Sequence, residues 1–264
     1  MTQKDIPNCF LPVTQLSEKL EEGLLSSLEL IEEYLERIRK HDRNLGSFID
    51  VYEKEARKAA SASDMSRASG HIIGPLQGIP VAVKDIIDIE GKITTGGSMV
   101  WKDRRSSLTA TLVRRMVEAG MIVLGKTHTV EFAMGSFGTN QHMGSPKNPW
   151  DLEDHRATGG SSAGTAAAVA AGLTPWGIGT DTGGSVRIPS AWCGLTGLKT
   201  SVGRISTHGV LPLSHTLDTP GPMCRSVEDS AILYRILAGP DEQDSRTLIH
   251  PVEEPFPELK KAIS

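Results

Sequence analysis

The stretch Ile79–Asp85, with the sequence IPVAVKD, is the segment that decides the fold. Its apolar run from position 79 to 83 predicts a short strand buried in a sheet. The run ends at Lys84, where a lysine normally extends its amine to water. If the amine is trapped instead, desolvation lowers its pKa and yields a neutral amine, which is a competent base. Met121–Leu124 predicts a second buried strand.

Helical signals alternate with these strands. Ser26 and Glu29 form a capping box, and apolar residues then recur at helical spacing. Gly120 and Gly172 each mark the end of one of the later helices. Strands that alternate with helices predict an α/β layered fold with a largely buried sheet. Beyond the helix that follows Ser26, the expected helices are Val51–Ser63, Thr109–Glu118, Ala166–Ala171 and Ser226–Leu237.

Composition excludes several classes of function. The chain has 264 residues, a net charge of -4 and an isoelectric point near 6.1, so nothing favours nucleic acid or an anionic membrane as a partner. The N-terminal residues lack the apolar stretch of a secretory signal, and Ala166–Ala171 is too short to span a bilayer. No nucleic-acid or membrane partner is therefore expected.

The cysteines and histidines show no metal-binding pattern. Cys9, Cys193 and Cys224 are an odd number without a CxxC spacing, which argues against both a disulfide scaffold and a zinc site. The eight histidines show no metal spacing either. We therefore expect no metal, no cofactor and a reducing cytoplasmic location.

Two motif matches fail on their context. Gly120–Thr127 has the letters of a phosphate-binding P-loop, but its intervening residues are Met-Ile-Val-Leu, whose amides are expected to pair within the sheet. Gly160–Gly164 has the letters of a GxSxG nucleophile elbow centred on Ser162. The residues before it are polar, whereas that motif requires an apolar strand leading into the turn. We reject both interpretations.

Two glycine–serine stretches remain. Gly179–Pro189 has the sequence GTDTGGSVRIP, and Gly159–Ser162 has the sequence GGSS. Glycines let backbone amides turn toward a bound oxygen, and a serine that follows them can attack a carbonyl whose oxygen rests on those amides. A glycine pair followed by a serine is, on its own, more often a turn that caps a helix than a catalytic loop. Taken singly, neither stretch identifies a function.

Taken together, four ordered blocks resemble the amidase signature family. They are Gly74–Asp85 (GPLQGIPVAVKD), Gly125–Gly135, which contains GKT and EFAMG, Gly159–Gly164 (GGSSAG) and Gly179–Ser185 (GTDTGGS). The 24 positions between Ser161 and Ser185 agree with the family's spacing of its two catalytic serines. The resemblance extends from about Ser26 to Asp244, and the glycine–serine blocks are its most specific part.

The resemblance implies a Ser–Ser–Lys mechanism. Ser185 corresponds to the nucleophile that forms the acyl-enzyme, and Ser161 to a bridging serine that follows a cis peptide after Gly160. Lys84 corresponds to the base, which takes the proton of Ser185 through Ser161. The oxyanion hole implied by position is formed by the backbone amides of Thr182, Gly183, Gly184 and Ser185.

Three further residues are expected to support the site. Asp181 and Arg187 flank the nucleophile and are expected to pair or to brace its loop. Ser162 is expected to cap the alanine-rich helix and to support Ser161. The fold implied is a mixed, buried β-sheet sandwiched between α-helices, in a partial amidase signature domain over residues 1–264. This comprises a helical layer over 1–70 and a catalytic core over 71–240, and the family's C-terminal half is absent.

Three functions stay open at this point. The leading hypothesis is an amidase that hydrolyses a small-molecule amide, alone or as a homodimer. The second is the A subunit of a glutamyl-tRNA(Gln) amidotransferase, the one hypothesis that requires partner subunits. The match around Glu131–Gly135 and Gly183–Arg187 is good for that amidotransferase, whereas Thr207–Asp218 is more similar to stand-alone amidases. The third is an inactive, truncated remnant.

Overall fold

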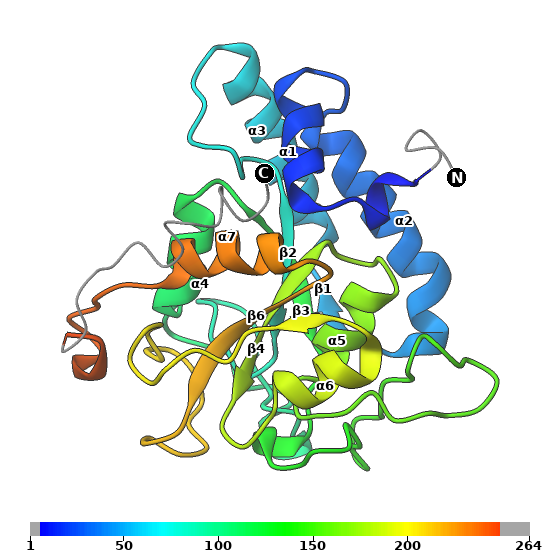
Figure 1. Cartoon of the computed structure of the whole chain (residues 1–264), viewed down its shortest axis with the longest axis vertical. Coiled ribbons are helices and arrows are strands. Elements are labelled where there is room, and N and C mark those ends of the chain that lie inside the picture. The colour runs from blue at the N-terminus through cyan, green and yellow to red at the C-terminus, as the bar shows by residue number, and fades with distance from the viewer. Residues whose placement is uncertain (1–5, 249–264) are drawn as a thin grey trace.

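The computed structural model describes residues 6–248, in which one mixed sheet lies between helices (Figure 1). The strand order is β1-β3-β2-β4-β6-β5. The strands are β1 (Phe48–Val51), β2 (Pro80–Lys84), β3 (Ile122–Thr127), β4 (Trp176–Asp181), β5 (Thr196–Gly197) and β6 (Thr219–Cys224). The helices are α1 (Val13–Glu21), α2 (Ser27–Leu45), α3 (Glu53–Ala68), α4 (Thr111–Glu118), α5 (Ala163–Ala170), α6 (Arg187–Cys193) and α7 (Val227–Leu237). Short 3₁₀ turns are η2 (Asn8–Phe10), η3 (Met99–Trp101), η4 (Glu131–Ala133) and η5 (Ser245–Thr247).

The centre of the sheet is parallel and its edges are antiparallel. β2 pairs in parallel with β3 on one side and with β4 on the other, and β1 and β6 pair antiparallel with the outer members of that trio. Because parallel strands run in the same direction, β2 and β4 end at the same edge of the sheet. Lys84 and Asp181, the last residues of these two strands, therefore come to one edge.

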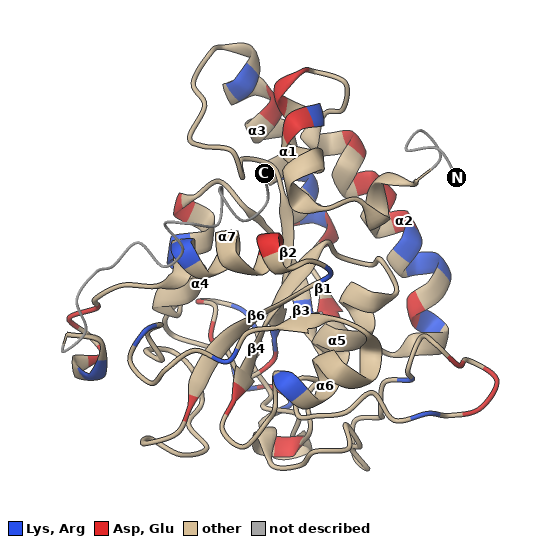
Figure 2. Ribbon diagram, in the orientation of Figure 1, with Lys and Arg blue, Asp and Glu red and all other residues tan. Residues whose placement is uncertain are grey.

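Helices cover both faces of the sheet. α5 contacts β1, β2, β3, β4 and β6 and packs with α6, and α4 and α7 pack with each other on the opposite side (Figure 1). α2 and α3 pair as an outer layer. Along α2, acidic residues lie in the N-terminal half and mostly basic residues in the C-terminal half (Figure 2). The α/β prediction, with a buried mixed sheet between helices, is confirmed.

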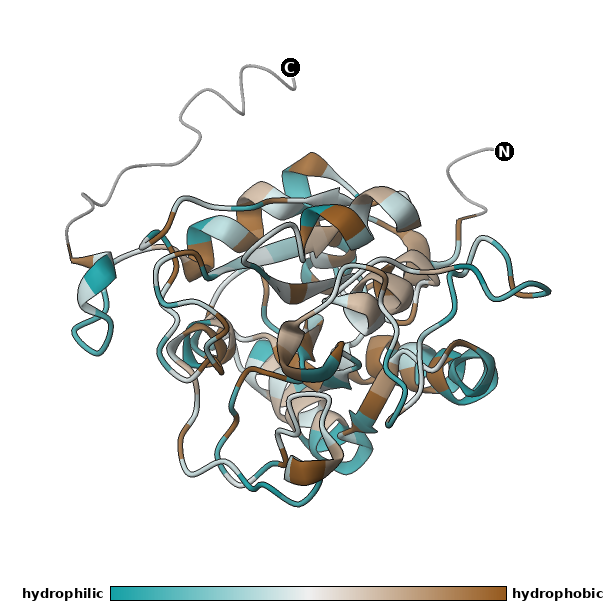
Figure 3. Cartoon of the chain, turned by 90° about the horizontal axis from the view of Figure 1, so that it is seen from below, coloured by the Kyte–Doolittle hydropathy of each residue, from teal (hydrophilic) through white to brown (hydrophobic). Residues whose placement is uncertain are grey.

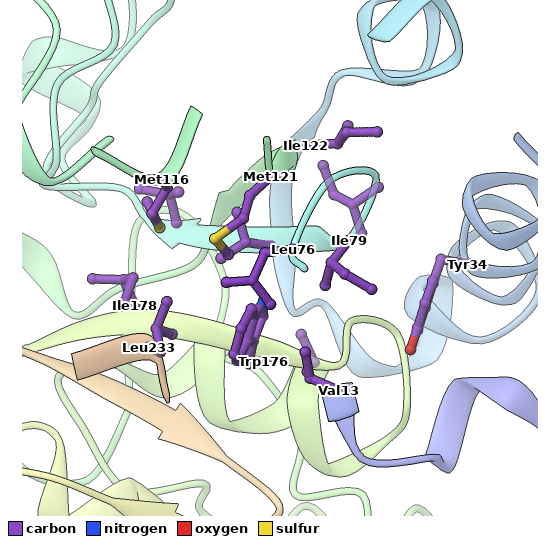
Figure 4. Close-up of a cluster of buried hydrophobic side chains, with 14 of the residues drawn as sticks. Val13, Tyr34, Leu76, Ile79, Met116, Met121, Ile122, Trp176, Ile178 and Leu233 are labelled. Atoms are coloured by element: carbon purple, nitrogen blue, oxygen red, sulfur yellow. The ribbon is translucent and has the colours of Figure 1, made fainter. Parts of the chain in front are cut away.

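The main core fills the space between the sheet and α1, α4 and α7. Trp176 of β4 lies among Leu233 of α7, Met116 of α4 and Val13 of α1, all completely buried (Figure 4). In the view from below, hydrophobic and hydrophilic residues follow one another along the helices, as amphipathic elements require (Figure 3). In the described range 6–248, no helix combines the length and the apolar character needed to cross a membrane.

Most of the expected elements are present with shifted ends. The capping box at Ser26 and Glu29 forms, with both of its hydrogen bonds. The strand expected at Met121–Leu124 is β3, which begins at Ile122 and continues to Thr127, so three of the four residues between the two P-loop glycines belong to a strand. The helix expected at Val51–Ser63 runs instead from Glu53 to Ala68, because its polar and alanine-rich sequence contains no stop signal before Gly70.

Sequence patterns did not reveal β4 or β6, whose sequences WGIGTD and TPGPMC are rich in glycine and proline. Their glycines are required by close packing. A Cβ at Gly177 would lie 2.6 Å from the Thr165 side chain of α5, and one at Gly179 would lie 2.6 Å from the Ser162 hydroxyl. Glycine weakens the strand signal of a sequence, yet here it lets α5 approach β4.

Candidate active site

Lys84 ends β2 with its side chain fully buried. Its amine donates hydrogen bonds to Ser161 Oγ at 2.7 Å and to Thr180 Oγ1 at 2.9 Å. No carboxylate forms an ion pair with this amine within residues 6–248. A buried amine held only by hydroxyl groups is poorly stabilised in its charged form.

The electrostatics of Lys84 follow from this burial. Desolvation lowers the pKa of the Lys84 amine from 10.5 to about 7, although the negative charges of Asp181 and Asp218 act in the opposite direction. Near neutral pH a large share of the amine is therefore uncharged and has a lone pair. A neutral amine next to a hydroxyl is a suitable general base.

Ser161 follows a cis peptide bond with Gly160, as the resemblance implied. Its carbonyl oxygen accepts hydrogen bonds from the Val130 amide at 3.2 Å and from Thr129 Oγ1 at 3.1 Å. The Gly160 amide donates to the Ser136 carbonyl at 2.7 Å. These contacts fix the backbone on both sides of the bond and direct the buried Ser161 hydroxyl to Lys84.

Ser162 does not cap α5 with its side chain, which corrects the expected role. Its hydroxyl donates to the Thr180 carbonyl and accepts from the Thr180 amide, both at 3.3 Å. It therefore joins the start of α5 to β4. Because Thr180 also contacts Lys84, this link still supports the arrangement around Ser161.

The loop of Ser185 connects β4 to α6 and is organised around Asp181. The buried Asp181 carboxylate accepts hydrogen bonds from the amides of Gly184 at 2.8 Å and Val186 at 3.1 Å. It also accepts from Arg187, whose guanidinium approaches it at 3.0 and 3.1 Å. These hydrogen bonds hold the pKa of Asp181 below its usual range although burial acts to raise it. Arg187 thus pairs with Asp181 and braces the loop.

One of the four expected oxyanion donors is not available in this arrangement. The Gly184 amide donates to Asp181 at 2.8 Å, so in this arrangement its N–H is already used. In contrast, the amides of Gly183 and Ser185 have no hydrogen-bond partner in the part of the chain that the structure describes. We therefore remove Gly184 from the predicted hole and keep Thr182, Gly183 and Ser185 as its candidates.

Ser185 lies beside the Ser161–Ser162 segment. The Ser162 amide donates to the Ser185 carbonyl at 3.3 Å, which joins the two glycine–serine loops. The Ser185 side chain is partly exposed, and within residues 6–248 its hydroxyl forms no hydrogen bond with that of Ser161. The site therefore contains a joined Lys84–Ser161 pair with Ser185 adjacent to it.

A second buried lysine was not identified by the sequence patterns. Lys126 of β3 donates hydrogen bonds to the Ile87 carbonyl at 2.6 Å and to Thr94 Oγ1 at 2.8 Å, and it pairs with Asp85 at 3.4 Å. In the β2–β3 register Lys126 lies opposite Val83, whereas Lys84 lies opposite Thr127. Since neighbouring residues of a strand face opposite sides, Lys126 faces away from the site.

Metal ligands do not gather anywhere between residues 6 and 248, where no group of three or more His, Cys, Asp or Glu side chains could hold an ion. All three cysteines are free and buried. The site described above consists of hydroxyl groups, one amine, backbone amides and the Asp181–Arg187 ion pair that braces the Ser185 loop.

A family model described as Amidase matches residues 29–263. The chain belongs to the amidase family. Two solved structures to which the chain is similar support this assignment. The chain superposes with a TM-score of 0.91 at 37% identity on a protein of the vestigial complex that revealed the origins of an s-triazine catabolic enzyme, covering 95% of this chain and 55% of that one. The peptide amidase of Stenotrophomonas maltophilia gives a TM-score of 0.87 at 38% identity, with 92% and 50% covered.

The curated relatives of the chain include amidotransferase subunits. The chain is 44% identical over 251 residues to the A subunit of glutamyl-tRNA(Gln) amidotransferase from Halorhodospira halophila, covering 95% of this chain and 51% of the relative. The solved structure of the corresponding protein from Thermotoga maritima gives a TM-score of 0.79 at 36% identity, with 94% and 51% covered. This amidase-family chain thus spans about half the length of the curated relatives it matches.

Proposed function

We propose that this amidase-family chain carries the reacting groups for hydrolysis of a small-molecule amide at its carbon–nitrogen bond. One observation carries the proposal. The fully buried Lys84 amine lies 2.7 Å from Ser161 Oγ and has no carboxylate partner among residues 6–248, next to the loop that presents Ser185. A base with a pKa close to neutrality, connected to a hydroxyl relay, is suited to activating a serine.

Acylation begins at the Ser185 hydroxyl. As its oxygen attacks the amide carbonyl, its proton passes to Ser161 Oγ, and the Ser161 proton passes to the Lys84 lone pair. In the neutral amine the hydrogen bond with Ser161 reverses, so that Ser161 Oγ donates to the lone pair, while Thr180 Oγ1 still accepts one N–H of the amine at 2.9 Å. Substrate binding closes the gap between the Ser161 and Ser185 hydroxyls, since catalytic hydrogen bonds often shorten only in the complex.

Collapse of the tetrahedral intermediate breaks the carbon–nitrogen bond. Lys84 returns the proton through Ser161 to the leaving nitrogen, which departs as ammonia or an amine. Water then repeats the sequence on the acyl-enzyme and releases the carboxylic acid. The amides of Thr182, Gly183 and Ser185 are the proposed donors to the oxyanion, each of which typically contributes about 100- to 1000-fold in rate.

The A subunit of glutamyl-tRNA(Gln) amidotransferase is the second candidate. It is favoured by the 44% identity to that relative over 95% of the chain. In that case glutamine is the amide, the ammonia is passed on, and activity depends on partner subunits. The peptide amidase similarity at 38% identity supports the stand-alone alternative.

Active-site labelling tests the proposal. The full chain is incubated with a fluorophosphonate, and intact mass and peptide mapping identify the modified residue. We expect labelling at Ser185 that is lost in Ser185→Ala and strongly reduced in Ser161→Ala. Val202→Ala, at a position outside both glycine–serine loops, is the matched control. Labelling that persists in Ser185→Ala, or no labelling of the folded wild type, would refute the proposed nucleophile. Ammonia release from glutamine only when the other components of an amidotransferase are added would favour the second candidate.

A further inference from the structure

Asp218, in the loop that precedes β6, is a buried carboxylate with partners on both oxygens. Its Oδ2 accepts hydrogen bonds from the Leu213 amide at 2.8 Å and the Ser214 amide at 2.9 Å. Its Oδ1 accepts from Thr182 Oγ1 at 2.5 Å. A carboxylate fixed by two backbone amides is a rigid anchor, so the bond to Thr182 holds that residue in place.

Thr182 is the first residue after β4 and begins the loop that carries Ser185. The later part of this loop is held by Asp181 through the amides of Gly184 and Val186. The candidate oxyanion amides lie between these two anchor points. The start of the loop is therefore held by Asp218, which precedes β6, and its later part is held by Asp181, the last residue of β4.

The same two carboxylates act on Lys84. Asp181 and then Asp218 raise the pKa of the Lys84 amine against the larger lowering by burial. Thr180, Thr182 and Asp218 line one small cavity at this edge of the sheet, and Thr180 contacts the amine directly. Lys126 of β3 is also buried nearby, but it faces the other side of the sheet and pairs there with Asp85.

We propose that Asp218 is a positioning residue for the hydrolysis, which holds Thr182 so that the oxyanion amides face the reacting carbonyl and supplies negative charge near the Lys84 amine. This inference rests on the function proposed above. Asp218 lies outside the glycine–serine blocks and outside the loop that carries Ser185, 33 positions beyond that serine. It reaches the site only because β6 pairs with β4, with Thr219 opposite Asp181.

Two variants separate the hydrogen bond from the charge. Asp218→Asn keeps the size of the side chain, and its amide oxygen can still accept from the Leu213 and Ser214 amides. Its NH2 group then faces Thr182 Oγ1, so this variant removes both the negative charge and the acceptor of the Thr182 hydroxyl. Thr182→Val removes the hydroxyl donor and leaves the charge of Asp218 in place. The measurements are the rate of fluorophosphonate labelling at pH 8 and the titration of the Lys84 side chain by NMR.

We expect both variants to be labelled about 5- to 100-fold more slowly than the wild type, at or below the loss typical of one oxyanion donor. Only Asp218→Asn should move the Lys84 titration to lower pH, since a negative charge that favours the ammonium is lost. A structural role alone would slow labelling without moving the titration. Unchanged labelling in a folded Thr182→Val variant would overturn the positioning role, and an unchanged Lys84 titration in Asp218→Asn would overturn the charge role.

Failure of the proposed function gives a different pattern. If the wild type is not labelled at all, the proposed serine chemistry fails, while the Lys84 titration in Asp218→Asn still decides whether Asp218 acts on the amine. If Asp218→Asn does not fold, Thr182→Val alone decides the positioning role through its labelling rate. The charge role is then tested with Asp218→Ser, which also removes the charge and should move the Lys84 titration to lower pH, and an unchanged titration would overturn that role.

Discussion

Replacing Lys84 with methionine makes the cost of burying its amine measurable. The side chain is fully buried, and burial lowers its pKa from 10.5 to about 7. The difference corresponds to about 5 kcal/mol, at roughly 1.4 kcal/mol per pKa unit. Methionine has a similar length and no charge, so the variant lacks this cost, although it also loses the hydrogen bonds to Ser161 and Thr180.

The pH dependence isolates the titration from those lost hydrogen bonds. Between the two pKa values the unfolded wild type holds a proton on Lys84 that the folded protein lacks, so the wild type gains stability as pH rises. Below about pH 7 the difference in unfolding free energy between the two proteins is constant. From pH 7.5 to pH 9.5 it should shift by about 2.5 kcal/mol in favour of the wild type.

Urea unfolding of both proteins at several pH values provides the assay. Other groups titrate in both proteins and largely cancel in the difference, which leaves Lys84 as the source of the change. A difference that stays constant from pH 7 to pH 10 would show that Lys84 keeps an ordinary pKa, and the proposed neutral base would then be absent.

Three further perturbations follow from packing and charge. Gly179→Ala places a Cβ 2.6 Å from the Ser162 hydroxyl and 2.8 Å from the Met223 sulfur, and it should lower the urea midpoint by an amount equivalent to about 1–3 kcal/mol. Asp181→Asn weakens the acceptor of several loop hydrogen bonds, and labelling should fall more than about 10-fold, with Asp50→Asn at the sheet edge as the control. Lys126→Met leaves the buried Asp85 carboxylate unpaired and should cost about 3–5 kcal/mol, most of which Asp85→Asn in the same chain should restore. Additive rather than compensating effects in that double variant would contradict the pairing.

The sequence predicted the central part of the fold because its signals there are local. β2 and β3 are short apolar runs, and α2 begins with a capping box that involves residues three positions apart. β4 and β6 escaped prediction because their glycines are required by contacts with α5, Ser162 and Leu198, which are distant in sequence. A propensity scale scores glycine as unfavourable in a strand. It contains no information about the neighbouring element whose close packing requires the glycine.

The sequence was sufficient to select the residues of the candidate site, but not to predict the hydrogen bonds between them. Each glycine–serine stretch was ambiguous alone, and the resemblance of four ordered blocks selected Lys84, Ser161 and Ser185. The hydrogen bond of the Gly184 amide to Asp181, the contact of Ser162 with β4 and the anchoring of Thr182 by Asp218 all depend on how the loops fold back. No periodicity or spacing reports such contacts, since they join segments brought together by the sheet.

The rate at which Ser185 is acylated by a fluorophosphonate, measured from pH 5.5 to pH 9 on the full chain, tests the central claim most directly. If a neutral Lys84 amine with a pKa of about 7 takes the proton through Ser161, the rate should rise about tenfold per pH unit below 7 and level off above it. A rate that keeps rising tenfold per unit up to pH 9, or one that is independent of pH and unchanged in Lys84→Met, would contradict it.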